Sequence, residues 1–132
     1  MKIACYSAML RSAARRLTAG YDEMLAPLGI NTAQYSLLRT ISRNEPVTLT
    51  EIGRRLELDR STVGRNVRVV ERLGLVKLGR GEDQREANVT LTEAGHTVLA
   101  EAVPLWQTEQ AAFETRLGTD TAQALRETLS RI

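Results

Sequence analysis

The hydrophobic pattern of this chain changes from a helical to a strand period at Gly74 and returns to a helical period at Thr92. Before Gly74, apolar side chains recur every three or four residues, which is the spacing of one helix face. Residues 75–80 and 87–91 instead favour strands, and the polar residues 81–84 between them are typical of a hairpin loop. One short hairpin therefore interrupts a series of helices, and the pattern predicts a mainly α fold with a small β-hairpin.

Residues that cap or end helices divide the rest of the chain. Asn, Thr and Asp side chains accept hydrogen bonds from the free N–H groups of a first helical turn, whereas Gly and Pro end a helix. The predicted helices begin at about Lys2, Asn31, Thr48, Asp59, Thr92 and Thr119 or Asp120. Thr48 and Glu51 have the spacing of a capping box, in which hydroxyl and carboxylate satisfy N–H groups reciprocally. Four helices, a hairpin and two helices are the order of a winged helix-turn-helix flanked by further helices.

The segment from Leu56 to Gly74 separates valines from arginines. Successive residues of a helix are turned by about 100°. One side of this helix therefore carries Ser61, Arg65, Arg68 and Arg72, and the opposite side carries Val63, Val67, Val70 and Leu73. We expect the valine side to pack on the preceding helix. The arginine side suits the major groove of DNA, because arginine can form two hydrogen bonds with guanine, and a helix N-terminus with Ser61 and Thr62 favours phosphate. Taken alone, such a face is more often an ordinary solvated surface.

The hairpin loop holds nearly as many acids as bases. Glu82, Asp83 and Glu86 almost cancel the charge of Arg80 and Arg85. Asp83 and Arg85 lie on one side of an extended loop, so the carboxylate can hold the guanidinium in one direction. A fixed arginine at a loop tip fits the narrow minor groove of A·T-rich DNA. The alternative is an exposed ion pair of little energetic consequence.

Composition restricts the function classes. The 132 residues, 42% of them apolar, are enough for one domain with a genuine core. Charge is uneven, since residues 54–85 hold 9 basic and 5 acidic side chains and residues 86–132 hold 3 and 7. Cys5 is the only cysteine, so no intrachain disulfide or zinc-binding cysteine cluster can form. No apolar run approaches the ~20 residues that span a bilayer. We therefore expect a cytoplasmic protein without a metal or cofactor. No group of residues has a catalytic pattern, so we do not expect an enzyme.

Two motifs carry a resemblance to a known family. The pattern Asp83-x-Arg85, followed by Leu91-Thr92-x-x-Gly95, resembles the MarR (multiple antibiotic resistance regulator) family of bacterial winged-helix repressors. The stretch LTEIGRRLELDRSTVGRNVRVVERLGLV is similar to the paired DNA-binding helices of that family and its first wing strand. The resemblance covers nearly the whole chain. It implies a homodimeric repressor that binds a pseudo-palindromic operator on double-stranded DNA and is released by a small molecule, with aromatic compounds as one candidate class.

The resemblance also assigns roles along the chain, which it treats as one domain over residues 1–132. Dimerisation helices would occupy residues 1–30 and 93–132, around a winged helix-turn-helix DNA-binding region at residues 31–92. The terminal helices are amphipathic and the centre is small, so self-association would bury their apolar stripes. Arg85 would be the minor-groove arginine of the wing and Asp83 its orienting partner. The expected DNA-binding residues are Ser61, Thr62, Arg65, Arg68, Arg80, Asp83, Arg85 and Arg54.

Two kinds of signal remain open. A ligand would lie between the dimerisation helices and the winged helix, where Tyr35, Trp106 and Arg15 are candidate lining residues, although such aromatic residues are more often part of a core. Alternatively, the protein is a thiol-based oxidant-sensing repressor, because Cys5 lies where the organic-hydroperoxide-sensing branch of the family carries a reactive cysteine. That chemistry needs positive charge or a helix N-terminus near the thiol, and otherwise Cys5 is a small hydrophobe in a dimer seam. A winged helix used for protein contact is the remaining alternative, and it would not need the arginine face.

Overall fold

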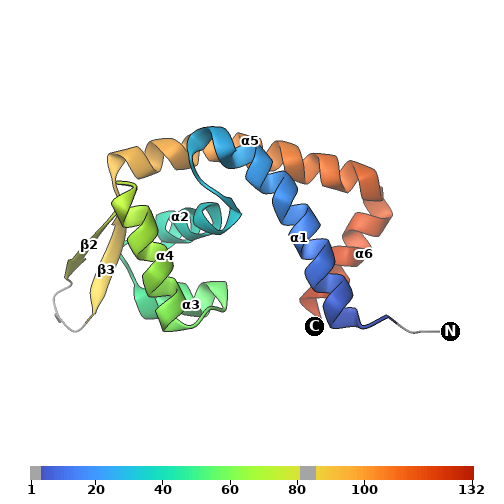
Figure 1. Ribbon diagram of the computed structural model, residues 1–132, viewed down its shortest axis with the longest axis horizontal. Coiled ribbons are helices and arrows are strands. Elements are labelled where there is room, and N and C mark those ends of the chain that lie inside the picture. The colour runs from blue at the N-terminus through green and yellow to red at the C-terminus, as the bar shows by residue number, and fades with distance from the viewer. Residues whose placement is uncertain (1–3, 81–85) are drawn as a thin grey trace.

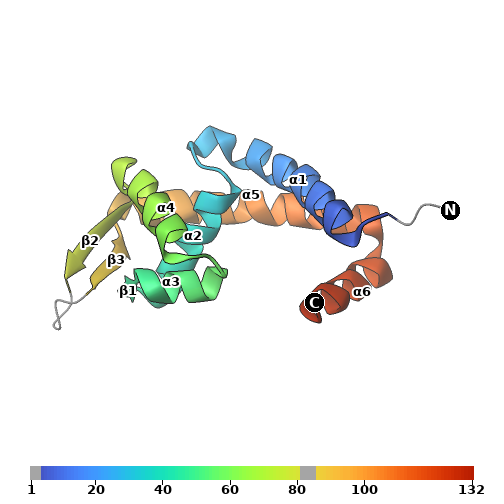
Figure 2. The same ribbon diagram turned by 60° about the horizontal axis from the view of Figure 1, so that its bottom comes forward.

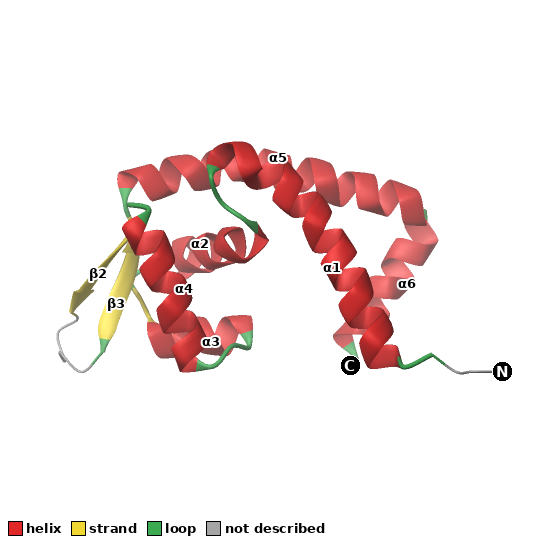
Figure 3. Ribbon diagram, in the orientation of Figure 1, coloured by secondary structure: helices red, strands yellow, loops and turns green. Residues whose placement is uncertain are grey.

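A computed structural model describes residues 4–80 and 86–132 of the chain. Its elements are α1 (Tyr6–Leu25), η1 (Ala26–Leu28), α2 (Thr32–Asn44), β1 (Val47–Thr48), α3 (Leu49–Leu56), α4 (Arg60–Arg72), β2 (Val76–Arg80), β3 (Ala87–Leu91), α5 (Glu93–Leu117) and α6 (Thr119–Ser130). Figure 1 shows that α5 runs along the molecule, with α2, α3, α4 and the strands at one end and α1 and α6 at the other. The mainly α fold with a small β-hairpin is confirmed, as the colouring in Figure 3 makes plain.

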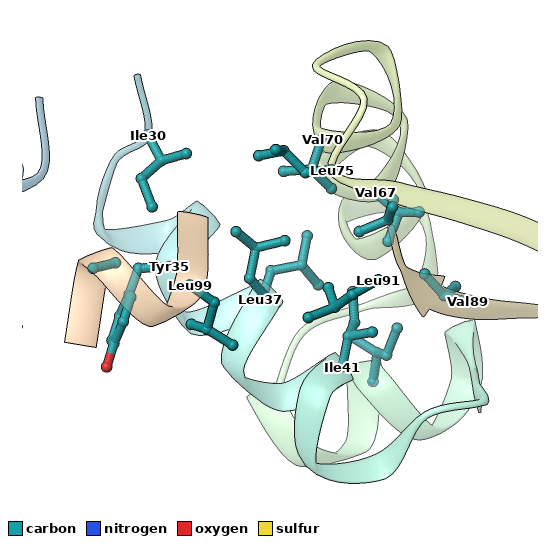
Figure 4. Packing of buried hydrophobic residues seen from close by; sticks show 14 of the residues in the cluster. Ile30, Tyr35, Leu37, Ile41, Val67, Val70, Leu75, Val89, Leu91 and Leu99 are labelled. Atoms are coloured by element: carbon teal, nitrogen blue, oxygen red, sulfur yellow. The ribbon is translucent and has the colours of Figure 1, made fainter. Parts of the chain in front are cut away.

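The core lies within the helix-turn-helix end of the molecule. Side chains from α2, α4, the sheet and the first turns of α5 point toward one another (Figure 4), and they form one buried cluster. Val63, Val67 and Val70 are buried in it, as the helical pattern predicts. Leu73 is not, since it remains 50% exposed as the C-terminal cap of α4. The prediction for Leu73 was wrong because this residue lies about 90° away from the centre of the valine face, and Leu75 enters the core instead.

Side-chain caps set the starts of the helices. The Asn31 side chain accepts a hydrogen bond from the Gln34 N–H at 2.9 Å, and the Gln34 side chain accepts one from the Asn31 N–H at 2.9 Å, which completes a capping box. Thr48 accepts from the Glu51 N–H at 3.1 Å. The reciprocal half of this second box is absent, because the Glu51 carboxylate binds two arginines instead. The helix predicted from Lys2 begins at Tyr6.

Three strands form one antiparallel sheet in the order β1-β3-β2. The predicted hairpin is present, and it pairs Val76 with Leu91 and Arg80 with Ala87. The short strand β1 was not predicted, because its two residues are too few to show an alternating pattern. Val47 of β1 pairs with Val89 of β3 and is buried. This pairing joins the hairpin to the start of α3, so the wing and the helix-turn-helix share a sheet (Figure 2).

The start of α5 is held tightly against the end of α4. The Thr92 hydroxyl donates to the Gly74 carbonyl at 2.6 Å, and the Thr92 N–H donates to the Leu75 carbonyl at 3.0 Å. A Cβ atom at Gly95 would lie 2.0 Å from the Leu75 carbonyl oxygen. Only glycine permits this approach, which fixes how α5 leaves the winged helix.

Candidate nucleic-acid interface

Helix α4 presents an arginine face to solvent. Its buried valines face the core, and the side chains of Ser61, Arg65, Arg68 and Arg72 are exposed, as the sequence predicts. Within the described residues, Arg65, Arg68 and Arg72 form no salt bridge, and Arg65 makes one hydrogen bond, to the Thr62 hydroxyl at 3.2 Å. These guanidinium groups therefore keep most of their donors available for an anionic partner.

The first turn of α4 is organised by Asp59. Its carboxylate accepts from the Ser61 hydroxyl at 2.7 Å, the Thr62 N–H at 2.8 Å and the Thr62 hydroxyl at 2.9 Å. Donation by the Ser61 hydroxyl, followed by the two Thr62 donors, lowers the pKa of Asp59 to about 2. Ser61 and Thr62 are thus held in fixed orientations, and the negative charge of Asp59 already occupies the helix N-terminus that the sequence suggested for phosphate.

Helix α3 carries two further arginines, Arg54 and Arg55, both bound to Glu51. Arg54 donates to the two Glu51 oxygens at 2.9 Å and 2.6 Å, and the Arg55 Nε donates to one of them at 2.9 Å. The hydrogen bond from Arg54 is the main reason why the pKa of Glu51 falls to about 2. Both guanidinium groups are exposed, so Arg54 can face a phosphate, but its charge is partly balanced by Glu51.

The base of the wing contacts the helix-turn-helix through Glu86, which was not predicted as a site residue. The Glu86 carboxylate accepts from the Thr50 N–H at 3.0 Å and the Thr50 hydroxyl at 2.6 Å, and it lies 3.6 Å from the guanidinium of Arg60. Arg80 ends β2 and is exposed. Asp83 and Arg85 lie outside the described residues. No local signal could have linked Glu86 to Thr50, because the contact depends on the sheet.

Two of the three candidate ligand-lining residues lie together. The rings of Tyr35 and Trp106 stack with centroids 5.8 Å apart, and Trp106 also stacks on Tyr21 of α1 at 6.2 Å. The Arg39 guanidinium lies 5.1 Å from the centre of the Trp106 ring and donates to the Tyr35 hydroxyl. The Tyr21 hydroxyl donates to the Gln110 side chain, and burial raises the pKa of Tyr21.

This aromatic cluster joins α1, α2 and α5, the helices between which a ligand was expected. Tyr35 is buried, and Figure 4 shows its hydroxyl pointing away from the other core side chains. Arg15 is exposed on α1, and within the described residues the structure shows no interaction between its side chain and the aromatic cluster. The cation beside the rings is Arg39. It was not predicted, although its four-residue spacing from Tyr35 places the two side chains on one helix face.

Cys5 is the N-terminal cap of α1 and is exposed. Its carbonyl accepts from the Met9 N–H at 3.0 Å. The thiol therefore lies at a helix N-terminus, the position that the sequence analysis required for reactivity. Among residues 4–80 and 86–132, no three His, Cys, Asp or Glu side chains are grouped as metal ligands would be. In the same ranges, no helix is long and apolar enough to cross a bilayer.

Comparison with known proteins gives consistent matches. The family model described as "MarR family" matches residues 28–86. A Bacillus subtilis (strain 168) protein named organic hydroperoxide resistance transcriptional regulator is 31% identical over 98 residues, which are 74% of this chain and 67% of that protein. The chain spans between 61% and 67% of the length of the curated relatives it matches.

Two solved structures are similar over almost the whole chain. The M. tuberculosis transcriptional regulator MosR in complex with DNA has a TM-score of 0.88 and 34% identity, and the match covers 97% of this chain and 92% of that one. The transcriptional repressor CouR bound to p-coumaroyl-CoA has a TM-score of 0.88 and 26% identity, with 96% and 89% covered. The matches extend over the hairpin and the flanking helices, and the chain belongs to the MarR family of transcriptional regulators.

Proposed function

We propose that this protein is a homodimeric transcriptional repressor that binds a pseudo-palindromic operator in double-stranded DNA. The observation that carries the proposal is the exposed arginine face of α4, whose Arg65, Arg68 and Arg72 form no salt bridge within the described residues while the valines opposite are buried. The similarity to MosR, which was solved with DNA, supports the same use of the fold. A helix used for protein contact would not need three exposed guanidinium groups on one face.

We assign the DNA contacts from the place of each residue in the winged helix-turn-helix. Arg65 and Arg68 would enter the major groove, where a guanidinium can bind guanine O6 and N7 together. Ser61 and Thr62, held by Asp59, would lie beside them. Outside this helix, we assign Arg54 to a phosphate, Arg85 to the minor groove with Asp83 as its orienting partner, and Arg80 to the DNA-binding surface of the wing.

The dimer is proposed from an apolar groove at the other end of the molecule. It has a volume of about 670 Å³, lies between α1, α5 and α6, and reaches Glu57 at the end of α3. Its apolar lining residues are Leu10, Ala13, Ala14, Leu17, Phe113, Leu117, Ala122, Leu125, Leu129 and Ile132. Among these residues the Ile132 side chain is more than half exposed, and so are Tyr6 and Met9 of α1. A two-fold partner covering this groove would place two α4 helices on successive half-sites, about one DNA turn apart.

Substitution of the arginine face tests the DNA-binding assignment. Arg65→Ala and Arg68→Ala should each weaken operator binding by about tenfold to a hundredfold, because a two-bond contact with guanine discriminates by about 1–3 kcal/mol. Arg11→Ala, which removes the same charge from α1, should change the affinity much less. Equilibrium binding to an operator selected from random duplexes gives the measurement. Unchanged affinity and base preference in both α4 variants would contradict the assignment.

We propose two candidate signals. CouR was solved with p-coumaroyl-CoA, and the cluster of Tyr35, Trp106 and Arg39 offers aromatic faces and a cation that suit an aromatic anion, with Arg15 a more distant candidate. Oxidation of Cys5 is the second candidate. It is favoured by the exposed position of the thiol at a helix N-terminus and by the name of the B. subtilis relative.

DNA binding before and after stoichiometric organic hydroperoxide separates the two signals. A Cys5 sensor predicts that peroxide releases the wild type from its operator and leaves Cys5→Ser bound, since the thiolate is the group oxidised. If peroxide leaves wild-type binding unchanged, the thiol mechanism is wrong and the small-molecule signal remains. We further propose that the protein acts by binding and not by catalysis, in the cytoplasm where its DNA lies.

A further inference from the structure

Glu86 is an acid on a surface that the proposed function turns toward DNA. It lies at the base of the wing, directly before β3, and its side chain is 23% exposed. Its Oε1 atom receives both Thr50 donors and faces the Arg60 guanidinium at 3.6 Å. One carboxylate oxygen therefore joins three elements, namely the start of β3, the first turn of α3 and the first turn of α4.

The contact adds a second acceptor to the N-terminal cap of α3. A helix leaves its first N–H groups without partners inside the helix. Thr48 satisfies the N–H of Glu51, and Glu86 satisfies that of Thr50. Glu51, which the sequence favoured as the capping carboxylate, is bound to Arg54 and Arg55. Negative charge at a helix N-terminus is stabilising, and donation by the Thr50 hydroxyl lowers the pKa of Glu86.

We propose that Glu86 is a positioning residue for DNA binding, which fixes the base of the wing against the helix-turn-helix so that both reach their grooves together. This inference rests on the proposed function. A negative charge near DNA phosphates opposes binding by itself. The proposal and simple electrostatics therefore predict opposite signs when the charge is removed, and this difference makes the proposal testable.

The experiment compares Glu86→Ala and Glu86→Gln with Glu71→Gln. Glu71 lies on α4, is exposed, and forms no salt bridge or side-chain hydrogen bond within the described residues, so its substitution removes the same charge without a contact. We expect Glu86→Ala to weaken operator binding by about tenfold, the scale of a lost hydrogen bond to a charged group. Glu86→Gln, which keeps one acceptor, should fall between. Binding to a random duplex should stay equal or strengthen in all three.

The opposite result is equally clear. If both Glu86 variants bind the operator as tightly as Glu71→Gln does, Glu86 is an ordinary surface acid and the proposal is wrong. A wild type that does not distinguish operator from random duplex contradicts the proposed function instead, so the two failures are distinguishable.

A second variant covers the case in which Glu86→Ala unfolds. Thr50→Val removes the hydroxyl donor and keeps the N–H and the side-chain shape. Like the Glu86 variants, it should weaken operator binding. In the double variant with Glu86→Gln, the two losses of affinity should be less than additive, because both substitutions disrupt the same contact. Additive losses, or full affinity in Thr50→Val with an unchanged melting temperature, would overturn the proposal.

Discussion

Two glycines show how differently single residues of this fold tolerate a methyl group. Gly64 lies in the middle of α4, and a Cβ atom there would have no heavy atom within 4 Å. At Gly95 in the first turn of α5, the same atom would lie 2.0 Å from the Leu75 carbonyl oxygen. The backbone of Leu75 cannot move freely, since its N–H and carbonyl are both hydrogen-bonded. The same substitution therefore has opposite consequences at the two positions.

We predict that Gly64→Ala raises the free energy of unfolding by about 1 kcal/mol, the difference in helix propensity, and that Gly95→Ala lowers it by about 3 kcal/mol or more through overpacking. Urea denaturation of both variants measures the two changes in the free energy of unfolding. Gly64→Ala should also weaken operator binding, because the added methyl borders the arginine face. A Gly95→Ala variant as stable as the wild type would show that α5 can shift away from Leu75.

At the scale of the element, α4 depends on an ionised cap. The pKa of Asp59 is lowered to about 2 by the hydroxyl of Ser61 and the two donors of Thr62. A carboxyl group whose pKa is lower in the folded than in the unfolded chain stabilises the fold above its ordinary pKa of about 4, and this stabilisation disappears as the pH falls toward 2. Asparagine caps helices as well as aspartate does, but it does not titrate.

We predict that the stability difference between the wild type and Asp59→Asn is constant above about pH 5 and shifts against the wild type between about pH 4 and pH 2. Thermal unfolding at a series of pH values gives the comparison. Glu51 titrates in the same range, but it is present in both proteins and cancels in the difference. Parallel curves down to pH 2 would mean that the Asp59 charge does not stabilise α4.

The elements that were predicted well are those with a local signal. Asn31, Asp59 and Thr92 each accept a hydrogen bond from the residue three positions later, so the starts of α2, α4 and α5 could be predicted from short stretches of sequence. The two-residue strand β1 has no such signal, and it forms because β3 lies beside it.

Interactions between distant segments were not predictable in the same way. The capping-box spacing at Thr48 indicated that Glu51 would close the box, whereas arginines three and four residues later take its carboxylate. Glu86 lies 36 residues from Thr50, and their contact exists only because the sheet places the wing beside α3. The roles assigned to Asp83 and Arg85 stay predictions. The arginine face was predictable because it depends on helix geometry alone.

At the scale of the whole molecule, the groove between α1, α5 and α6 exposes apolar side chains that nothing in a single chain covers. Leu129 lines it and is 47% exposed. A negative charge placed there would be taken out of water in a dimer, which is strongly unfavourable, because Arg126 in the same lining is already paired with Glu114 at 3.0 Å. Leu73, at the end of α4, is similarly exposed but belongs to the winged-helix end of the molecule.

We predict that the wild type is a dimer at micromolar concentration, that Leu129→Glu is monomeric with its helix content retained, and that Leu73→Glu remains dimeric. Light scattering with circular dichroism measures all three. The monomer should bind an operator much more weakly, because only one half-site is engaged at a time. A wild type that scatters as a monomer would contradict the two-half-site arrangement.

Helix α5 connects the two ends of the molecule over 25 continuous helical residues, with Pro104 inside it, from the return of the wing to the edge of the groove. A helix of this length is about 37 Å long along its axis at about 1.5 Å per residue. A tilt of about 5° at the groove would move its far end by about 3 Å, the length of a hydrogen bond. Leverage of this kind would allow a small rearrangement between subunits to pull the guanidinium groups out of reach of the bases, without any change inside the winged helix itself.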